Sequence, residues 1–545
     1  MSYMADYLLQ HDLLRSAAHV PEATALRYRG RDMSYGELLA QSIHLSDTLI
    51  HQGIRIGECA ALCLEKSPQA VIAMFAVLFS GGAYIPLDTA YAPVHRVLAI
   101  VEQSGTGYLL TDAATLSKLW NGAETQHRAM LKSLQIVLLE DALEEVSELP
   151  DAAERHGIIR FSSPHGRSPR CLYKDRKEAI SDDVAFILYT SGSTGIPKGV
   201  MISHLNARTF IEWCCGYFKP ESQDIFASIA PFHFDLAVFD LFVPLAAGAS
   251  LVILPPEVIQ NPRRFAAAVK EEGINWAYSV PSLWTSVIKY GGLAPGELPS
   301  LRKVLFAGEV FQPKYLRMAM ELLPQASFYN LYGLIETNVC TYYEVDRAQA
   351  LREEPLPIGY ACANTEVVAL TNEGRIAAAG EEGELCVRGP IVMKGYYRNP
   401  ELTALSFTGH PAFPESGIRL YRTGDMVTIN AEGAFVLIGR KDSLVKRAGF
   451  RIELPEIELA LHDMEGVSEA AVVDIRDGDD VLLLCAAVVP QPGSRLSVLG
   501  VKQAVGARLP HYMIPDLVQV MESLPTGSSE KVDRQSLKQL FQKQL

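Results

Sequence analysis

The 545-residue chain lacks the features that mark several classes of protein. No run approaches about 18 apolar residues, so we expect no membrane-spanning helix. No basic stretch followed by an apolar one stands near the start, so we expect no secretory signal and a cytoplasmic location. The formal net charge of −14 argues against nucleic acid and against an anionic membrane as the main partner.

Several common motifs are missing as well. The nine cysteines contain no CxxC pair and stand mostly in apolar runs, which predicts buried free thiols. The chain has no GxGxxG fingerprint, no GxSxG nucleophile elbow and no Walker A spacing, so no motif supports a dehydrogenase or a hydrolase. Its 48% hydrophobic composition is that of an ordinary globular protein, and its length predicts two or more domains.

Short apolar runs alternate with amphipathic segments, a pattern typical of parallel α/β sheets. Residues 68–79 predict a helix, and residues 84–87 begin a loop. Residues 144–182 are polar and punctuated by proline and glycine, which predicts a linker. We expect strands at residues 60–64, 107–110, 184–188, 224–229, 250–254, 276–280 and 303–306.

The same patterns predict a multi-domain α/β protein. We expect an N-terminal core of parallel α/β sheets over residues 1–440. From about residue 358 to 440 the strands become shorter and alternating, with glycine in the turns, which indicates a small β-rich subdomain. Residues 441–545 carry another strand–helix set and predict a small, mobile α+β lid domain.

The sharpest local signal is YTSGSTGIPKG at residues 189–199, directly after an expected strand. Glycines let backbone N–H groups approach a ligand, hydroxyls donate to phosphate oxygens, and Lys198 supplies positive charge. A flexible surface turn is the alternative, but two hydroxyl–glycine pairs and a terminal PKG favour a phosphate site. We expect this site to comprise Thr190, Ser191, Gly192, Ser193, Thr194, Gly195 and Lys198.

Further motifs follow one another along nearly the whole chain. They are GGAYIPLD (81–88), the loop above, FD (234–235), NLYGLIET (330–337), GELCVRG (383–389), YRTGD (421–425), GRKD (439–442), KRAGFRIELPEIE (446–458) and EKVDR (530–534). In this order they resemble the adenylate-forming superfamily. Within it, the chain is most similar to stand-alone amino-acid adenylation enzymes of nonribosomal peptide synthesis.

The resemblance implies ATP and Mg²⁺ as cofactors and gives roles to particular residues. Glu336 would hold the Mg²⁺, a hard ion that prefers carboxylate and phosphate oxygens. Asp425 would accept the ribose hydroxyls, Arg440 would lie close to the same sugar, and Tyr332 would pack near the adenine. Other nucleotide contacts are expected from the same motif as Tyr332, at Gly333 and Thr337.

Two residues near the C-terminus carry the implied catalytic cycle. Lys531 would bridge the substrate carboxylate and the α-phosphate while pyrophosphate is displaced. Asp442 would be the hinge about which the lid rotates between adenylation and transfer to a phosphopantetheine thiol. Eleven residues follow Arg534, too few for a carrier domain, so the resemblance implies a separate carrier protein as the acceptor.

The substrate is indicated by the residues expected around its side chain. By resemblance, Asp235 pairs with the α-ammonium, which favours amino acids over fatty or aryl acids. Phe239 and Tyr278 are bulky and predict a shallow cavity for a small apolar amino acid. The remaining lining is expected from Leu236, Leu305, Ala307, Leu331, Val339 and Cys340. This set resembles that of L-proline adenylating enzymes, although composition and spacing alone do not separate proline from valine or alanine.

Two other functions stay open. An acyl- or aryl-CoA ligase of the same superfamily is disfavoured by Asp235 and by the GGAYIPLD segment. A non-catalytic nucleotide-binding relative is disfavoured by the joint presence of Lys531, Glu336, Asp425 and Arg440, although two departures from the family pattern would favour it. Ile335 stands where the family usually has threonine, and Glu530 stands where a glycine is common.

Overall fold

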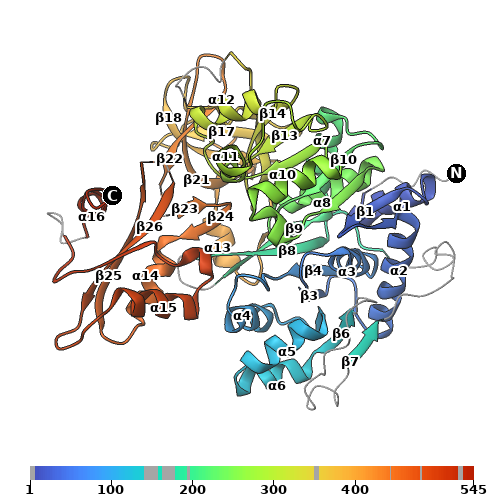
Figure 1. Ribbon diagram of the computed structural model, residues 1–545, viewed down its shortest axis with the longest axis horizontal. Helices are drawn as coiled ribbons and strands as arrows, with labels where there is room; N and C mark the ends of the chain where they lie inside the picture. Colours follow the sequence, from blue (N-terminus) through green and yellow to red (C-terminus); the bar gives the residue numbers. More distant parts are fainter. Residues whose placement is uncertain are drawn as a thin grey trace.

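The computed structural model describes residues 7–139, 158–161, 178–192, 197–348, 355–441, 444–478, 481–525 and 532–545. Two large sheets with their helices form the bulk of the molecule, and a smaller set of strands and helices lies at the opposite end from the N-terminus (Figure 1). The predicted multi-domain α/β class is confirmed. Within the described residues, no helix is long and apolar enough to cross a membrane.

The nine-stranded sheet has a parallel centre and antiparallel edges. Its central strands are joined by helices, as parallel pairing requires. The order is β16 (Tyr360–Ala361), β15 (Asn338–Glu344), β14 (Ser327–Leu334), β13 (Lys303–Phe306), β12 (Trp276–Ser279), β10 (Ile225–Ser228), β11 (Ser250–Ile253), β1 (Thr24–Tyr28) and β2 (Arg31–Ser34). Its outer face is covered by α10 (Pro262–Glu271), α11 (Pro281–Tyr290) and α12 (Pro313–Leu322), with the short α9 (Pro256–Ile259) beside them.

The eight-stranded sheet is parallel except for the pairs that β9 makes. The order is β19 (Gly395–Tyr396), β9 (Lys198–Ser203), β8 (Val184–Thr190), β4 (Ala83–Pro86), β3 (Cys59–Cys63), β5 (Tyr108–Thr111), β6 (Gln135–Leu139) and β7 (Ile158–Phe161). One face is covered by α4 (Val94–Ser104), α5 (Ala113–Gly122) and α6 (Thr125–Ser133).

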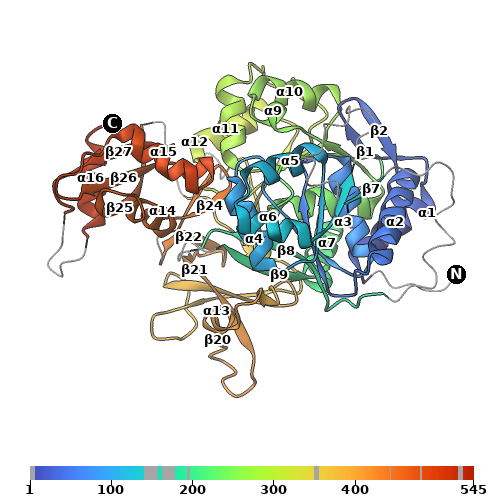
Figure 2. The ribbon, with the colours of Figure 1, turned by 90° about the horizontal axis from the view of Figure 1, so that it is seen from below.

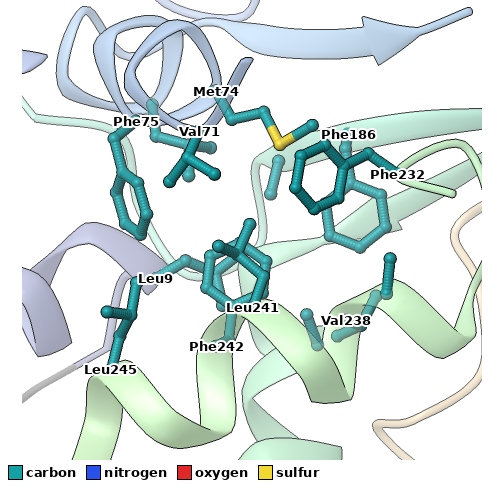
Figure 3. Packing of buried hydrophobic residues seen from close by; sticks show 14 of the residues in the cluster. Leu9, Val71, Met74, Phe75, Phe186, Phe232, Val238, Leu241, Phe242 and Leu245 are labelled. Atoms are coloured by element: carbon teal, nitrogen blue, oxygen red, sulfur yellow. The ribbon is translucent and has the colours of Figure 1, made fainter. Parts of the chain in front are cut away.

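Five helices contact one another and strands of both sheets, and they bury the largest apolar cluster. Two of them, α3 (Pro68–Phe79) and α8 (Leu236–Ala247), are apolar on nearly all sides, which is typical of a helix buried all round. Figure 3 shows side chains of both helices meeting, with the rings of Phe75 and Phe242 5.8 Å apart. The other three are α1 (Leu9–His19), α2 (Tyr35–His51) and α7 (His204–Phe218).

A five-stranded antiparallel sheet occupies the segment for which the sequence predicts a β-rich subdomain. It projects away from the two large sheets together with α13 (Pro400–Leu405) (Figure 2). Its strands are β17 (Glu366–Leu370), β18 (Glu382–Arg388), β21 (Arg419–Ile429), β20 (Phe407–Gly409) and β22 (Phe435–Arg440).

The C-terminal part begins with a hairpin of β23 (Leu444–Arg447) and β24 (Phe450–Glu453). A three-stranded sheet follows, formed by β25 (Val467–Arg476), β26 (Leu482–Pro490) and β27 (Leu517–Val520). Its helices are α14 (Leu454–His462), α15 (Val498–Arg508) and α16 (Arg534–Gln542), and a 3₁₀ turn spans His511–Met513. It has its own apolar cores.

Two expectations about the chain are wrong. Residues 84–87 were expected to begin a loop, but Ala83–Pro86 forms β4, a buried central strand between β3 and β8. The expected linker at residues 144–182 contains β7, which extends the sheet beyond β6. The eight cysteines of the described residues are free, as predicted, and seven of them are buried.

Candidate active site

Glu336 lies at the centre of the site, in the turn between β14 and β15, and is fully buried. Its Oε1 accepts a hydrogen bond from the Tyr396 hydroxyl at 2.8 Å. Arg451 donates to both carboxylate oxygens, at 2.9 and 2.8 Å. Burial would raise the pKa of Glu336, but the charge of Arg451 and the hydrogen bonds to the carboxylate together outweigh it and hold that pKa below its ordinary value. The carboxylate is therefore ionised and suited to a cation.

A cleft of about 930 Å³ opens between the nine-stranded sheet, the five-stranded sheet and the C-terminal part, and Glu336 is not among its lining residues. Asp425 and Arg440 stand opposite each other on β21 and β22, 2.6 Å apart, and both line the cleft. The Tyr332 hydroxyl donates to the second oxygen of Asp425 at 2.5 Å. The structure thus brings together the three residues expected around the adenosine.

The expected phosphate loop is described in part. Thr190 ends β8, and Thr190 and Ser191 line a second, smaller cavity. Gly192 adjoins them, while Ser193, Thr194 and Gly195 lie outside the described residues. Lys198 starts β9, and its Nζ lies 2.8 Å from a carboxylate oxygen of Glu453 on β24.

Gly333 and Thr337 flank the turn that carries Glu336. A Cβ at Gly333 would lie 1.6 Å from the carbonyl oxygen of Asn338, so only glycine fits there. Thr337 is buried, and its hydroxyl accepts a hydrogen bond from the backbone N–H of Leu334 at 3.1 Å. Thr337 therefore fixes the turn, and it lines neither of the two cavities.

The smaller cavity, of about 90 Å³, contains Asp235. Asp235 is the N-cap of α8, and one of its oxygens accepts a hydrogen bond from the N–H of Leu236 at 3.0 Å. Burial raises the pKa of Asp235 to about 6, although the positive charge of Lys446 opposes this. Four other residues of the expected substrate set also line this cavity: Leu236, Tyr278, Ala307 and Val339.

Four residues of that set do not line the smaller cavity. Phe239 is buried and packs edge to face on Tyr278, with ring centroids 5.2 Å apart. Leu305 is paired with Tyr278 across β12 and β13, and Cys340 is fully buried. Leu331 lines the larger cleft instead. Phe239 and Leu305 therefore bear on the cavity through Tyr278 rather than lining it.

The hairpin β23–β24 supplies residues that sequence reasoning left without a role. Lys446 lines both cavities, and its Nζ lies 5.6 Å from the centre of the Tyr332 ring. The Ser191 hydroxyl donates to the carbonyl oxygen of Arg451 at 2.7 Å. Phe450 contacts Phe234 edge to face at 5.1 Å. All three hairpin residues belong to the KRAGFRIELPEIE motif, which was the available signal.

Two expected residues cannot be placed. Lys531 and Asp442 lie outside the described residues. Their predicted roles as catalytic lysine and hinge remain predictions.

A buried, ionised carboxylate, a cleft lined by a ribose-type aspartate, and the hydroxyls of Thr190 and Ser191 on a second cavity are together typical of a nucleotide-dependent enzyme. The family model "AMP-binding enzyme" matches residues 13–397, and "AMP-binding enzyme C-terminal domain" matches residues 456–531. The chain belongs to this family of AMP-binding enzymes.

Curated relatives match along nearly the whole chain. An L-proline–[L-prolyl-carrier protein] ligase of Pseudomonas fluorescens is 34% identical over 97% of this chain and 98% of its own. A ligase of the same description from Streptomyces coelicolor is 33% identical over 96% of each. Among solved structures, IdnL1 covers 95% of this chain and 99% of its own at 27% identity, with a TM-score of 0.77.

Proposed function

We propose that this enzyme uses ATP to activate L-proline as prolyl-adenylate and then transfers the prolyl group to the phosphopantetheine thiol of a separate carrier protein in the cytoplasm. Family membership supports ligase chemistry with ATP. The observation that carries the substrate is the small cavity, which holds one carboxylate, Asp235, among mostly apolar groups. A compact ring with a secondary ammonium fits that combination, and two curated relatives bear the name of proline ligases.

In adenylation, Asp235 would pair with the substrate ammonium and so direct the substrate carboxylate toward the nucleotide. Asp425 and Arg440 would hold the ribose, with Tyr332 beside the adenine. A carboxylate oxygen attacks the α-phosphorus, and pyrophosphate leaves on the opposite side. No side chain acts as a covalent nucleophile in this reaction, so its rate depends on positioning and on neutralising the charge that develops. Lys531 would supply that positive charge.

Mg²⁺ fits Glu336, because this carboxylate is fully buried, ionised and already paired with a cation. When bound, the ion would neutralise charge on the phosphates of ATP. In the described arrangement Arg451 donates hydrogen bonds to both oxygens of Glu336, and Glu453 forms an ion pair with Lys198. Adenylation therefore requires the hairpin to withdraw, and the described arrangement suits the later transfer step.

The test is amino-acid-dependent exchange of pyrophosphate into ATP, measured over all proteinogenic amino acids, benzoates and fatty acids. Proline should give the highest kcat/KM, with valine and alanine weaker. Lys531→Ala should reduce exchange by orders of magnitude while ATP binding is retained. Exchange with benzoates or fatty acids and with no amino acid would contradict the proposal and favour the acyl-CoA ligase alternative.

A further inference from the structure

His233 lies in the loop between β10 and α8, two residues before Asp235, and lines the same small cavity. Its Nε2 is 3.9 Å from Oδ2 of Asp88, and its ring lies beside that of Phe234, with centroids 4.9 Å apart. Both of these atoms are buried, and neither has a hydrogen-bond partner among the described residues. Leaving two such atoms without partners is costly, and their position beside the substrate cavity suggests a use for them.

Asp88 is held in place by its own loop. Its Oδ1 accepts hydrogen bonds from the backbone N–H groups of Ala90 and Tyr91, at 3.1 and 2.8 Å. The second oxygen is therefore left to face His233. The 3.9 Å gap is longer than a hydrogen bond, and a small approach of the two side chains would close it. A carboxylate bonded to one ring nitrogen would keep the proton on that nitrogen and make the other nitrogen, Nδ1, the acceptor.

The surroundings favour a neutral imidazole. Burial lowers the pKa of His233, and Asp88 only partly offsets this. A neutral histidine at pH 7 accepts a proton. The other titratable side chains that line the cavity are Asp235, Lys446, Arg451, Tyr189, Tyr278 and Tyr512.

The cavity is also where the C-terminal part meets the core. Phe450 and Arg451 of the hairpin and Tyr512 of the 3₁₀ turn complete its wall. The amine nitrogen and the acyl carbon of an aminoacyl-adenylate are two bonds apart. An acyl group whose ammonium is bound by Asp235 therefore lies within the same small cavity as His233, so a thiol that attacks it must come close to this ring.

We propose that His233 is the general base of the transfer step and that Asp88 is its positioning residue. This inference rests on the proposed adenylation and transfer. Nδ1 of His233 takes the thiol proton while the sulfur forms a bond to the acyl carbon. The bond from that carbon to the AMP oxygen breaks, and AMP leaves with the electron pair. The imidazolium, paired with Asp88, later returns its proton to water.

The test compares two readouts on the full chain. Pyrophosphate exchange with proline reports adenylation, and single-turnover transfer of the prolyl group from preformed adenylate to free pantetheine reports the second step, each from pH 6 to 9. The variants are His233→Gln and Asp88→Asn. His127→Gln is the matched control, since His127 is another buried histidine near a carboxylate, 3.7 Å from Glu102 and outside the cavity.

In His233→Gln the ratio of transfer to exchange should fall about 100-fold at pH 7, the lower end of the effect of a general base. The deficit should shrink toward pH 9, because a thiol with a pKa of about 8.5 then ionises without help. Asp88→Asn should lower the same ratio about tenfold and shift the pH profile, in line with a positioning role. His127→Gln should leave both readouts unchanged.

Three results would overturn the assignment. They are an unchanged ratio in His233→Gln, an equal loss of both readouts, and a transfer deficit independent of pH. Failure of the proposed function is distinguishable, since the unmodified enzyme would then show no amino-acid-dependent exchange at all.

Discussion

The ion pair between Arg451 and Glu336 predicts that a single substitution improves ATP binding. Arg451 comes from the C-terminal hairpin and Glu336 from the core, and the two are 2.8 Å apart with Glu336 fully buried. If Glu336 is the Mg²⁺ ligand, Arg451 and the metal compete for the same two oxygens. Arg451→Ala should therefore lower the KM for ATP.

The magnitude follows from the burial of the pair. Removing one partner of a buried ion pair costs about 3–5 kcal/mol, and we take about 3 because the Arg451 side chain is 17% exposed. That lowers the population of the described arrangement about 100-fold relative to the open one. The apparent affinity for ATP is the intrinsic affinity multiplied by the fraction of molecules in the open arrangement. If about one molecule in ten of the unmodified enzyme is open, the substitution raises that fraction to nearly one. The KM for ATP then falls about tenfold and no further.

The assay is pyrophosphate exchange at saturating proline, with ATP and Mg²⁺ varied separately. Arg96→Ala should change the KM in the same direction, because Arg96 joins the core to Glu456 of α14 at 2.6 Å. Arg508→Ala is the control, since its partner Asp463 lies within the C-terminal part, and it should change nothing. A higher KM in Arg451→Ala would refute the reasoning, because Arg451 would then bind the nucleotide rather than exclude it.

Two further predictions concern the amino-acid cavity. Because the pKa of Asp235 is raised to about 6, the KM for proline should rise as the pH falls from 7 to 5, where the protonated carboxyl no longer pairs with the ammonium. Asp235→Asn should raise the proline KM at least about 30-fold at pH 7, lose this pH dependence, and change the ATP KM much less. Phe239→Leu removes the ring that supports Tyr278, so the exchange rate with pipecolate, one methylene larger than proline, should rise about tenfold relative to proline. An unchanged pipecolate-to-proline ratio would show that Phe239 does not limit the depth of the cavity.

Sequence patterns predicted those helices and strands whose ends are set by residues adjacent in the sequence. The helix predicted at residues 68–79 is observed with the same bounds, and the structure shows that Ser67 caps it and that Pro68 is its first residue. The strand at residues 303–306 was predicted as observed. The strand β4 was missed, and it ends at Pro86, which is paired with Leu62. Its burial between two neighbours overrides local propensity.

The candidate site divides in the same way. Asp235, Glu336 and Asp425 could be predicted as candidates because each belongs to a contiguous motif in the core. Arg451 was quoted within a motif but given no partner, because its contact with Glu336 joins residues 115 positions apart. Such a contact depends on how the C-terminal part packs against the core, which no local pattern records. Sequence reasoning assigned no role to His233 for a related reason, since Asp88, the carboxylate that faces it, lies in a different motif.

The strand β24 shows how one short segment can engage both charged groups of a nucleotide site. Side chains alternate along a strand, so Arg451 and Glu453 face the core while Ile452 is buried in the C-terminal part. Arg451 places a cation on Glu336, and Glu453 places an anion on Lys198. The strand thus gives the expected metal ligand, Glu336, a positive partner in place of a metal ion. It gives the expected phosphate ligand, Lys198, a negative partner in place of a phosphate. If Glu336 holds Mg²⁺ and Lys198 holds phosphate, as proposed, the hairpin can take this position only after pyrophosphate and its metal have left, and that exclusion would order the two half-reactions.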